Sequence, residues 1–304
     1  MTSCVLGAVA LLFVSTNAGA FCRKTTCSGS KCKKDEQGCS VDGAKVQWKT
    51  KCVSYSFNEK GSRILDPSRS RVAVEKAFEA WSLVDCGGGK IASMTFNQIE
   101  DVSCDKAQYN SSGPNVHVVV FRDDGWTYKD DGQGIQDTLA KTTVTFSPDN
   151  GEVFDADMEV NAAFNDFTTT VDDKGAIYDL QAIVTHEVGH FIGIDHSDKG
   201  GAVMYPTYDR GSIAQRTLTD DDIAAVCAAY PPDRDVACDS VPRGGLKGDC
   251  SGSPADDGIC SVGVGPKGGD SGNRGGTGAI GILGVCFACV AVRGSRRLVK
   301  RGIS

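Results

Sequence analysis

Three of the chain's four histidines lie within eleven residues, in the segment HEVGHFIGIDH that runs from His186 to His196. His186 and His190 are four residues apart, so a helix places both side chains on one face. Gly193 follows three residues later and tolerates the left-handed conformation that ends a helix. The chain can therefore turn at Gly193 and return His196 toward the first two. This spacing predicts a helix that ends beside its own side chains and gathers three imidazoles into one site.

Three neutral imidazoles suit a catalytic Zn²⁺, because they leave the ion one open position and its full charge. Water bound at that position becomes acidic, with its pKa falling from 15.7 toward about 7. Glu187 directly follows the first histidine, so its carboxylate can take the proton of that water without ligating the metal. The pattern indicates a zinc-dependent endopeptidase in which Glu187 is general base and general acid. Two alternatives are a zinc-bearing adhesion or binding module without catalysis, and a zinc amidohydrolase acting on a non-peptide amide.

The order H-E-x-x-H-x-x-G-x-x-H, followed by a methionine turn, is the pattern of the metzincins. Met204 follows in AVMYPTY, and together with Ser197 and the sequence Pro206-x-Tyr208 it makes the chain resemble the matrixins, the matrix-metalloproteinase family. The likeness extends over about residues 46–231. It implies a metzincin fold of class α+β, with a mixed twisted sheet of about five strands, three helices and an active-site cleft between two lobes.

The same resemblance implies that Met204 forms an apolar floor under the zinc and that Pro206 and Tyr208 line the substrate pocket. Matrixins usually hold a second, structural zinc, but His117 is the one histidine left for it, so we expect a single Zn²⁺. Asp155 matches a Ca²⁺ ligand of the family, whereas Met158 stands where an acid is expected. Asp155 is therefore either a calcium ligand or a capping or solvated carboxylate.

Hydrophobic periodicity supports this fold class independently. Helices are expected over residues 66–84, 179–192 and 219–230, where apolar residues recur at helical spacing. Asp66 or Ser68 can cap the first helix, and Thr219 caps the third. Strand-like runs occur at 46–57, 91–99, 115–121, 142–147 and 151–160. One helix, several strands and then two helices indicate an α+β domain.

Composition divides the chain into five parts. Residues 1–20 read as a secretory signal peptide, with a buried N-terminal helix as the alternative. A Cys-rich leader (21–45) precedes the catalytic domain (46–232), and a Gly/Ser/Asp-rich linker (233–278) follows it. The final segment (279–304) joins a short apolar run to an Arg-rich end. It resembles the sorting tails of bacterial surface proteins, or is an unstructured tail, so we expect an exported protein, extracellular or attached to the cell surface.

Cysteine content agrees with export. The chain has 14 cysteines, of which eleven lie between the signal peptide and the final segment, a density typical of disulfides in an oxidising compartment. The four leader cysteines form either disulfides or a zinc knot. Because eleven is odd, at least one of these thiols lacks an intrachain partner. An unpaired leader thiol could occupy the open position of the zinc.

Charge limits the choice of partner. The formal net charge is −7, and basic residues gather in the last 31 residues, which contain no acid. An acidic body disfavours nucleic acid, since phosphate contacts need clustered Lys and Arg. The expected partners are protein or peptide substrates, with membrane or cell-surface attachment through the C-terminal tail, and the chain is expected to be monomeric.

Overall fold

The computed structural model describes residues 20–126, 128, 138–170, 178–250, 283–286 and 291–292. Its main sheet has the strand order β11-β5-β6-β4-β2-β3. Strand β5 is antiparallel to β6, whereas β6, β4, β2 and β3 run parallel to one another. The strands are β2 Cys52–Phe57, β3 Thr95–Gln98, β4 Val118–Phe121, β5 Ala140–Phe146, β6 Val153–Val160 and β11 Leu283–Cys286. The five expected strands are thus present, and β11 pairs with the outer edge of β5.

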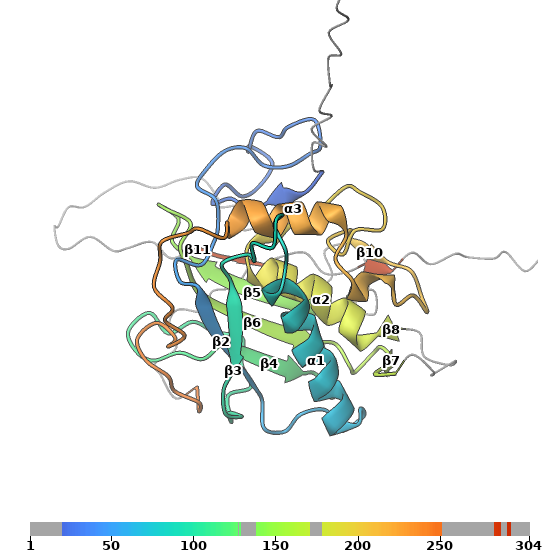
Figure 1. The fold of residues 1–304 in the computed structure, drawn as a ribbon. Coiled ribbons are helices and arrows are strands. Elements are labelled where there is room, and N and C mark those ends of the chain that lie inside the picture. The colour runs from blue at the N-terminus through green and yellow to red at the C-terminus, as the bar shows by residue number, and fades with distance from the viewer. Residues whose placement is uncertain are drawn as a thin grey trace, which may run out of the picture.

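Three α-helices complete the domain: α1 Pro67–Ser82, α2 Leu180–Phe191 and α3 Asp220–Ala229, with a short 3₁₀ helix, η1 Ala214–Arg216, before α3. Figure 1 shows α1 and α2 lying together on one face of the sheet, with α3 across the end of the molecule. Each helix begins where its sequence predicts. Asp66 accepts a hydrogen bond from Arg69 N, Asp179 accepts one from Ala182 N, and Thr219 forms a capping box with Asp222.

The core lies between the sheet and this helix pair. Aromatic rings from both layers meet there, with the rings of Tyr55 on β2 and Phe78 on α1 stacked at 3.9 Å between centroids. Trp81 and Phe191 are almost completely buried in the same cluster. The indole N–H of Trp81 donates to Thr185 O at 2.8 Å, so its polar atom is satisfied inside the core. This packing fixes α2, and with it the first two histidines, against the rest of the domain.

Short strand pairs surround the core. Strand β1 (Cys22–Arg23) is antiparallel to β9 (Ile194–Asp195), and β7 (Phe167–Thr168) is parallel to β8 (Tyr178–Asp179). Strand β10 (Thr207–Tyr208) is parallel to β12 (Ala291–Val292). Among the described residues, no helix has the length and apolarity required to cross a membrane. The predicted signal peptide lies outside the described residues except for Ala20.

Ten cysteines form five disulfides: Cys22–Cys39, Cys27–Cys32, Cys52–Cys238, Cys86–Cys227 and Cys104–Cys250. The expectation of disulfides is confirmed. Both ideas about leader thiols are wrong, because all four leader cysteines pair with one another and none is left to bind a metal. Cys260, the remaining member of the eleven, lies outside the described residues.

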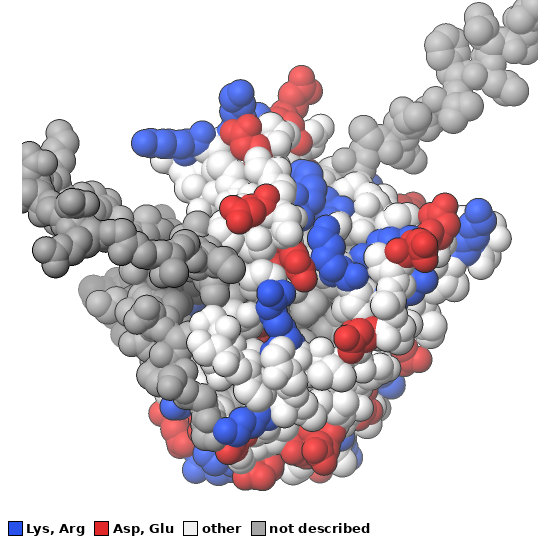
Figure 2. All heavy atoms as spheres, turned by 90° about the vertical axis from the view of Figure 1, so that its left-hand side faces the viewer, with Lys and Arg blue, Asp and Glu red and all other residues white. Residues whose placement is uncertain are grey.

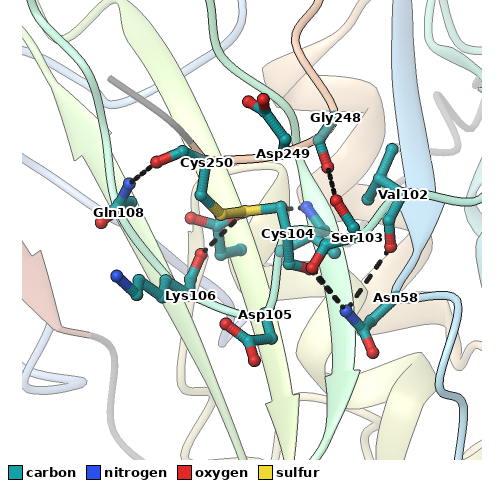
Figure 3. Close-up of a disulfide and its surroundings, with 12 residues drawn as sticks. Asn58, Val102, Ser103, Cys104, Asp105, Lys106, Gln108, Gly248, Asp249 and Cys250 are labelled. Atoms are coloured by element: carbon teal, nitrogen blue, oxygen red, sulfur yellow. Dashed lines mark hydrogen bonds between the residues drawn. A yellow bond between two sulfur atoms is a disulfide. The ribbon is translucent and has the colours of Figure 1, made fainter. Parts of the chain in front are cut away.

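The predicted linker starts too early at residue 233. Two of the disulfides join Cys238 and Cys250 to the catalytic domain. Figure 3 shows the second of them, where Ser103 and Gln108 also donate hydrogen bonds to the backbone carbonyls of Gly248 and Cys250. Residues 233–250 are therefore part of the folded domain. Their Gly, Pro and Asp content resembles a linker because they form turns held by covalent bonds rather than by a core of their own.

The charged surface is mixed in sign. Figure 2 shows Lys and Arg side chains interspersed with Asp and Glu over the face on the left of Figure 1. Several charged side chains of the domain pair, such as Lys60 with Asp105 at 3.1 Å and Arg71 with Asp101 at 2.6 Å. Exposed pairs of this kind contribute little to stability.

Candidate metal centre

Helix α2 and the turn after it bring the three predicted histidines together. His186 and His190 lie on one face of α2, which ends at Phe191, and Gly193 adopts a φ of 80° where the chain reverses. Strand β9 then leads directly into His196. The three rings lie 4.8 to 5.2 Å apart between centroids. Among the described residues, this trio is the one group of three His, Cys, Asp or Glu side chains spaced for a metal ion.

Backbone carbonyls orient two of the rings. His186 Nδ1 donates to Val203 O at 2.6 Å, and His190 Nδ1 donates to Ile194 O at 2.9 Å. Because a carbonyl oxygen only accepts, the hydrogen sits on Nδ1 and the lone pair is left on Nε2. Such a hydrogen bond on the far nitrogen is the usual way that proteins fix a metal-binding imidazole.

The Nε2 atoms converge in a way that fits Zn²⁺. His190 Nε2 and His196 Nε2 are 3.2 Å apart, and the buried Nε2 of His186 has no hydrogen-bond partner. Tetrahedral zinc with Zn–N bonds of about 2.0–2.1 Å separates its ligand nitrogens by roughly 3.3 Å. Lone pairs facing each other at this distance repel unless a cation lies between them. The residues therefore fit a three-histidine zinc site.

Burial keeps the imidazoles neutral, as metal ligation requires. It lowers the pKa of His186 to about 3, with a smaller contribution from neighbouring His196. Burial likewise lowers the pKa of His190 and of His196. The site therefore loses no affinity to protonation at neutral pH.

Glu187 lies one residue beyond the first ligand, and its buried side chain reaches strand β5. Its Oε2 accepts a hydrogen bond from Thr142 Oγ1 of β5 at 2.7 Å, whereas its buried Oε1 has no hydrogen-bond partner. Burial raises the pKa of Glu187 to about 8, and the Thr142 hydrogen bond opposes this shift. A nearby divalent cation favours the ionised form. Glu187 thus combines one anchored oxygen with one oxygen free for proton transfer.

Met204 packs against α2 at Gly189, between the positions of His186 and His190. It is 1% exposed. A Cβ atom added to Gly189 of α2 would lie 2.2 Å from Met204 Sδ and 3.0 Å from the Trp81 ring. Glycine at this position lets the methionine turn approach the helix that carries the ligands.

The comparisons with known proteins agree with this geometry. The family model for matrixins matches residues 47–231, more than half of the chain. The chain belongs to the matrixin family. Similar proteins include metalloendoproteinase 1-MMP of Arabidopsis thaliana, 26% identical over 65% of this chain and 48% of the plant protein. Mouse matrilysin is 37% identical over 36% of this chain and 37% of its own length. Human neutrophil collagenase is 26% identical over 64% of this chain and 36% of its own length.

This matrixin spans half or less of the length of these curated relatives. The matched region contains α1, α2, α3, the five strands of the predicted sheet and all three histidines. The leader before residue 47 and the disulfide-bonded segment after residue 231 lie outside it.

Sequence reasoning missed Asp222, which holds the methionine turn of this matrixin. The side chain is completely buried, and it accepts hydrogen bonds from Val203 N at 2.9 Å and Met204 N at 3.1 Å. It also accepts from the backbone and hydroxyl of Thr219. Val203 in turn supplies the carbonyl that orients His186. In the sequence, no local signal distinguishes Asp222 from Asp220 and Asp221, which lie in the same first helical turn.

The predicted pocket residues differ in exposure. Tyr208 is fully buried, and its hydroxyl accepts a hydrogen bond from Asp179 N at 3.0 Å and donates to Ser212 O. Pro206 is half-buried. Tyr208 thus connects the chain after the methionine turn to Asp179, the residue that caps α2. Lining of a substrate pocket by these two residues stays a prediction.

Asp155 lies in a buried acidic pair rather than at the surface. Asp155 and Asp157 are each 1% exposed on β6, and His117 Nε2 is 3.8 Å from Asp155 Oδ1. The interpretation of Asp155 as a capping or solvated carboxylate is therefore wrong. Burial raises the pKa of Asp155 to about 7, and burial and the neighbouring Asp155 raise that of Asp157. Burial lowers the pKa of His117 to about 4, so no positive charge balances the pair there.

Two carboxylates supply only part of the six to eight oxygens that Ca²⁺ takes. On the described residues alone, the pair does not fit a calcium site.

A hollow of about 940 Å³ at the end of β4 and β6 is lined by other residues, among them Lys60, Arg122 and Glu159, and contains none of the zinc-site side chains.

Proposed function

We propose that this protein is a zinc-dependent endopeptidase that cleaves peptide bonds in proteins. The observation that carries the proposal is the convergence of three histidine ligand nitrogens, together with the buried and unpartnered Oε1 of Glu187 one residue beyond the first ligand. A purely structural zinc has no need for a buried carboxylate with one unpartnered oxygen beside it. Membership of the matrixin family supports the same chemistry.

Zinc, when bound, supplies a Lewis acid that polarises the scissile carbonyl and acidifies water. Glu187 Oε1 accepts a proton from the attacking water as the water oxygen bonds to the carbonyl carbon. The same oxygen then delivers that proton to the leaving nitrogen as the carbon–nitrogen bond breaks. Thr142 holds Oε2 throughout, so the carboxylate does not rotate away between the two transfers.

Three further features are part of the proposal. Substrate lies across the site helix, in a cleft between two lobes, and Pro206 and Tyr208 line its specificity pocket. A calcium ion at Asp155 would need oxygen ligands beyond the two carboxylates of the buried pair, and calcium titration of thermal stability tests whether one binds. The protein acts as a monomer.

Export is supported by the apolar run from Cys4 to Val14, the small residues Ala18-Gly19-Ala20 and the five disulfides. We place the mature protein outside the cell or at its surface, with the basic C-terminal tail as the attachment. Mass spectrometry of the secreted protein tests the signal peptide, since removal of residues 1–20 leaves Phe21 first. Fractionation of cells that express the chain with and without residues 279–304 tests the attachment.

The decisive experiment incubates the full chain with a mixed protein substrate, with and without a zinc chelator, and maps the cut sites. Chelator-sensitive cleavage is expected. Glu187→Ala is the matched variant, because it leaves the three ligands in place. It should bind zinc normally and lose activity by 10²-fold or more, as removal of a general base does. If the wild type binds zinc but cleaves no protein, the proposal is wrong and the adhesion or binding module is favoured. If it cleaves only small amides, the amidohydrolase is favoured.

A further inference from the structure

The N-terminal module, residues 20–45, is packed against the chain between the second and third zinc ligands. It contains the disulfides Cys22–Cys39 and Cys27–Cys32, and it precedes the region that matches the family model. Figure 1 shows this blue segment at the end of the molecule where α3 lies. It therefore lies outside the region that the family model matches, and its contacts need an explanation.

Strand β1 of the module pairs with β9, the two-residue strand that joins His190 to His196. The register places Cys22 opposite Asp195 and Arg23 opposite Ile194. One residue further, Lys24 N donates to Gly193 O at 3.0 Å. The module thus contacts three consecutive residues between the two ligands, Gly193, Ile194 and Asp195.

That turn determines the position of both rings. Ile194 O accepts the hydrogen bond from His190 Nδ1, and Asp195 immediately precedes His196. Asp195 Oδ1 accepts a hydrogen bond from His196 N at 3.1 Å, while its Oδ2 lies 3.7 Å from Lys24 Nζ. A displacement of β9 would therefore move one ligand and release the hydrogen bond that orients the other.

A second line of contacts anchors the module itself. Val46 N donates to Lys24 O at 2.8 Å, and the Arg23 guanidinium donates to Ala228 O at the end of α3 and to the side chain of Gln47. A Cβ atom added to Gly193 would lie only 2.3 Å from the carbonyl oxygen of Val46, so the two backbone segments approach closely here. The turn is consequently held between β1 on one side and the strand connection at Val46 on the other.

We propose that the N-terminal module is a positioning element for the zinc site, that Lys24 is a positioning residue, and that the Cys22–Cys39 disulfide keeps β1 in register on β9. This inference rests on the proposed zinc site. A two-residue strand has too few contacts to stay ordered alone. The disulfide restricts the alternatives open to the segment, and a reducing environment would remove that restriction. Zinc affinity is therefore coupled to the redox state of a bond outside the matrixin domain.

The test is the zinc dissociation constant of the full chain, measured by competition with a chromophoric chelator. Cys22→Ser/Cys39→Ser should raise this constant by about 10- to 100-fold, the usual effect of removing groups that orient metal ligands. The matched control is Cys27→Ser/Cys32→Ser, which removes the other disulfide of the same module and should change the constant by less than about threefold. Equal constants for the wild type and both double variants would overturn the inference, and so would equal losses in both double variants.

A pair of single variants keeps the test decisive if the cysteine variants fail to fold. Lys24→Met removes the charge beside Asp195, and we expect a weaker zinc affinity that Lys24→Arg restores. No change in Lys24→Met would contradict the role of this residue. The readout is independent of proteolysis. Wild-type protein that binds zinc and cleaves nothing would refute the proposed activity while leaving the positioning role open to the same measurements.

Discussion

Substitution of Asp222 by Asn tests whether one carboxylate holds the methionine turn. The replacement keeps the volume of the side chain but makes one oxygen an NH₂ group. Oδ2 accepts three hydrogen bonds and Oδ1 accepts one, from Met204 N. The more favourable orientation of the new amide keeps its oxygen at the position of Oδ2. Its NH₂ group then faces the N–H of Met204, and both groups are donors. One hydrogen bond to a charged acceptor is lost, and a buried donor is left unpaired, for a total of about 3 kcal/mol.

The assay is thermal unfolding of the zinc-loaded chain with its disulfides intact. For a domain of this size, about 3 kcal/mol corresponds to a decrease in Tm of roughly 6–12 °C. Asp220→Asn is the control, because Asp220 is exposed in the same helical turn and contributes only about 0.3–1 kcal/mol through the helix dipole. If the two variants unfold within about 2 °C of each other, the assignment of Asp222 is refuted.

Three more predictions concern the turn, the acidic pair and the metal. Gly193→Ala should lower the free energy of unfolding by about 3 kcal/mol, because the new Cβ meets Val46 O and the φ of this residue is positive. Gly201→Ala is the control in urea unfolding, because Gly201 also has a positive φ but open space around it, and this change should cost about 1 kcal/mol. The raised pKa of Asp155 makes the folded state bind a proton more tightly. The stabilisation that this proton gives the folded state is present at low pH and is lost as pH rises through about 7. Asn carries no titrating proton, so the free energy of unfolding of Asp155→Asn minus that of the wild type should be a few kcal/mol larger at pH 8 than at pH 5. A constant difference in Tm between these two pH values would contradict this. Removal of zinc with a chelator should lower stability by about 4 kcal/mol relative to zinc at 1,000 times its Kd, and an unchanged Tm would show that the site is empty in the folded protein.

Much of the fold could be predicted from local patterns. The first and third helices begin at Asp66 and Thr219 because caps and apolar periodicity coincide there, the second follows its apolar periodicity, and the five predicted strands follow runs of β-branched and aromatic residues. The three histidines were identifiable because their spacing is set by a single helix and a glycine turn. Each of these signals lies within a short stretch of chain.

The contacts that complete the site are distant in sequence and escaped prediction. Thr142 reaches Glu187 across 45 residues, and Cys22 lies beside Asp195 only after the chain has folded. Disulfide pairing is likewise invisible in spacing alone, so residues 233–250 resemble a linker in sequence although Cys238 and Cys250 are joined to the domain by disulfides. Asp222 was indistinguishable from its acidic neighbours because its role depends on the turn that packs against it.

X-ray absorption at the zinc edge of the purified chain tests the central claim most directly, because it reports the metal and its ligands without reference to activity. We predict one zinc per chain with three nitrogen neighbours at about 2.0–2.1 Å and one further oxygen neighbour. A first shell containing sulfur, fewer than three imidazoles, or no zinc at all would contradict the account.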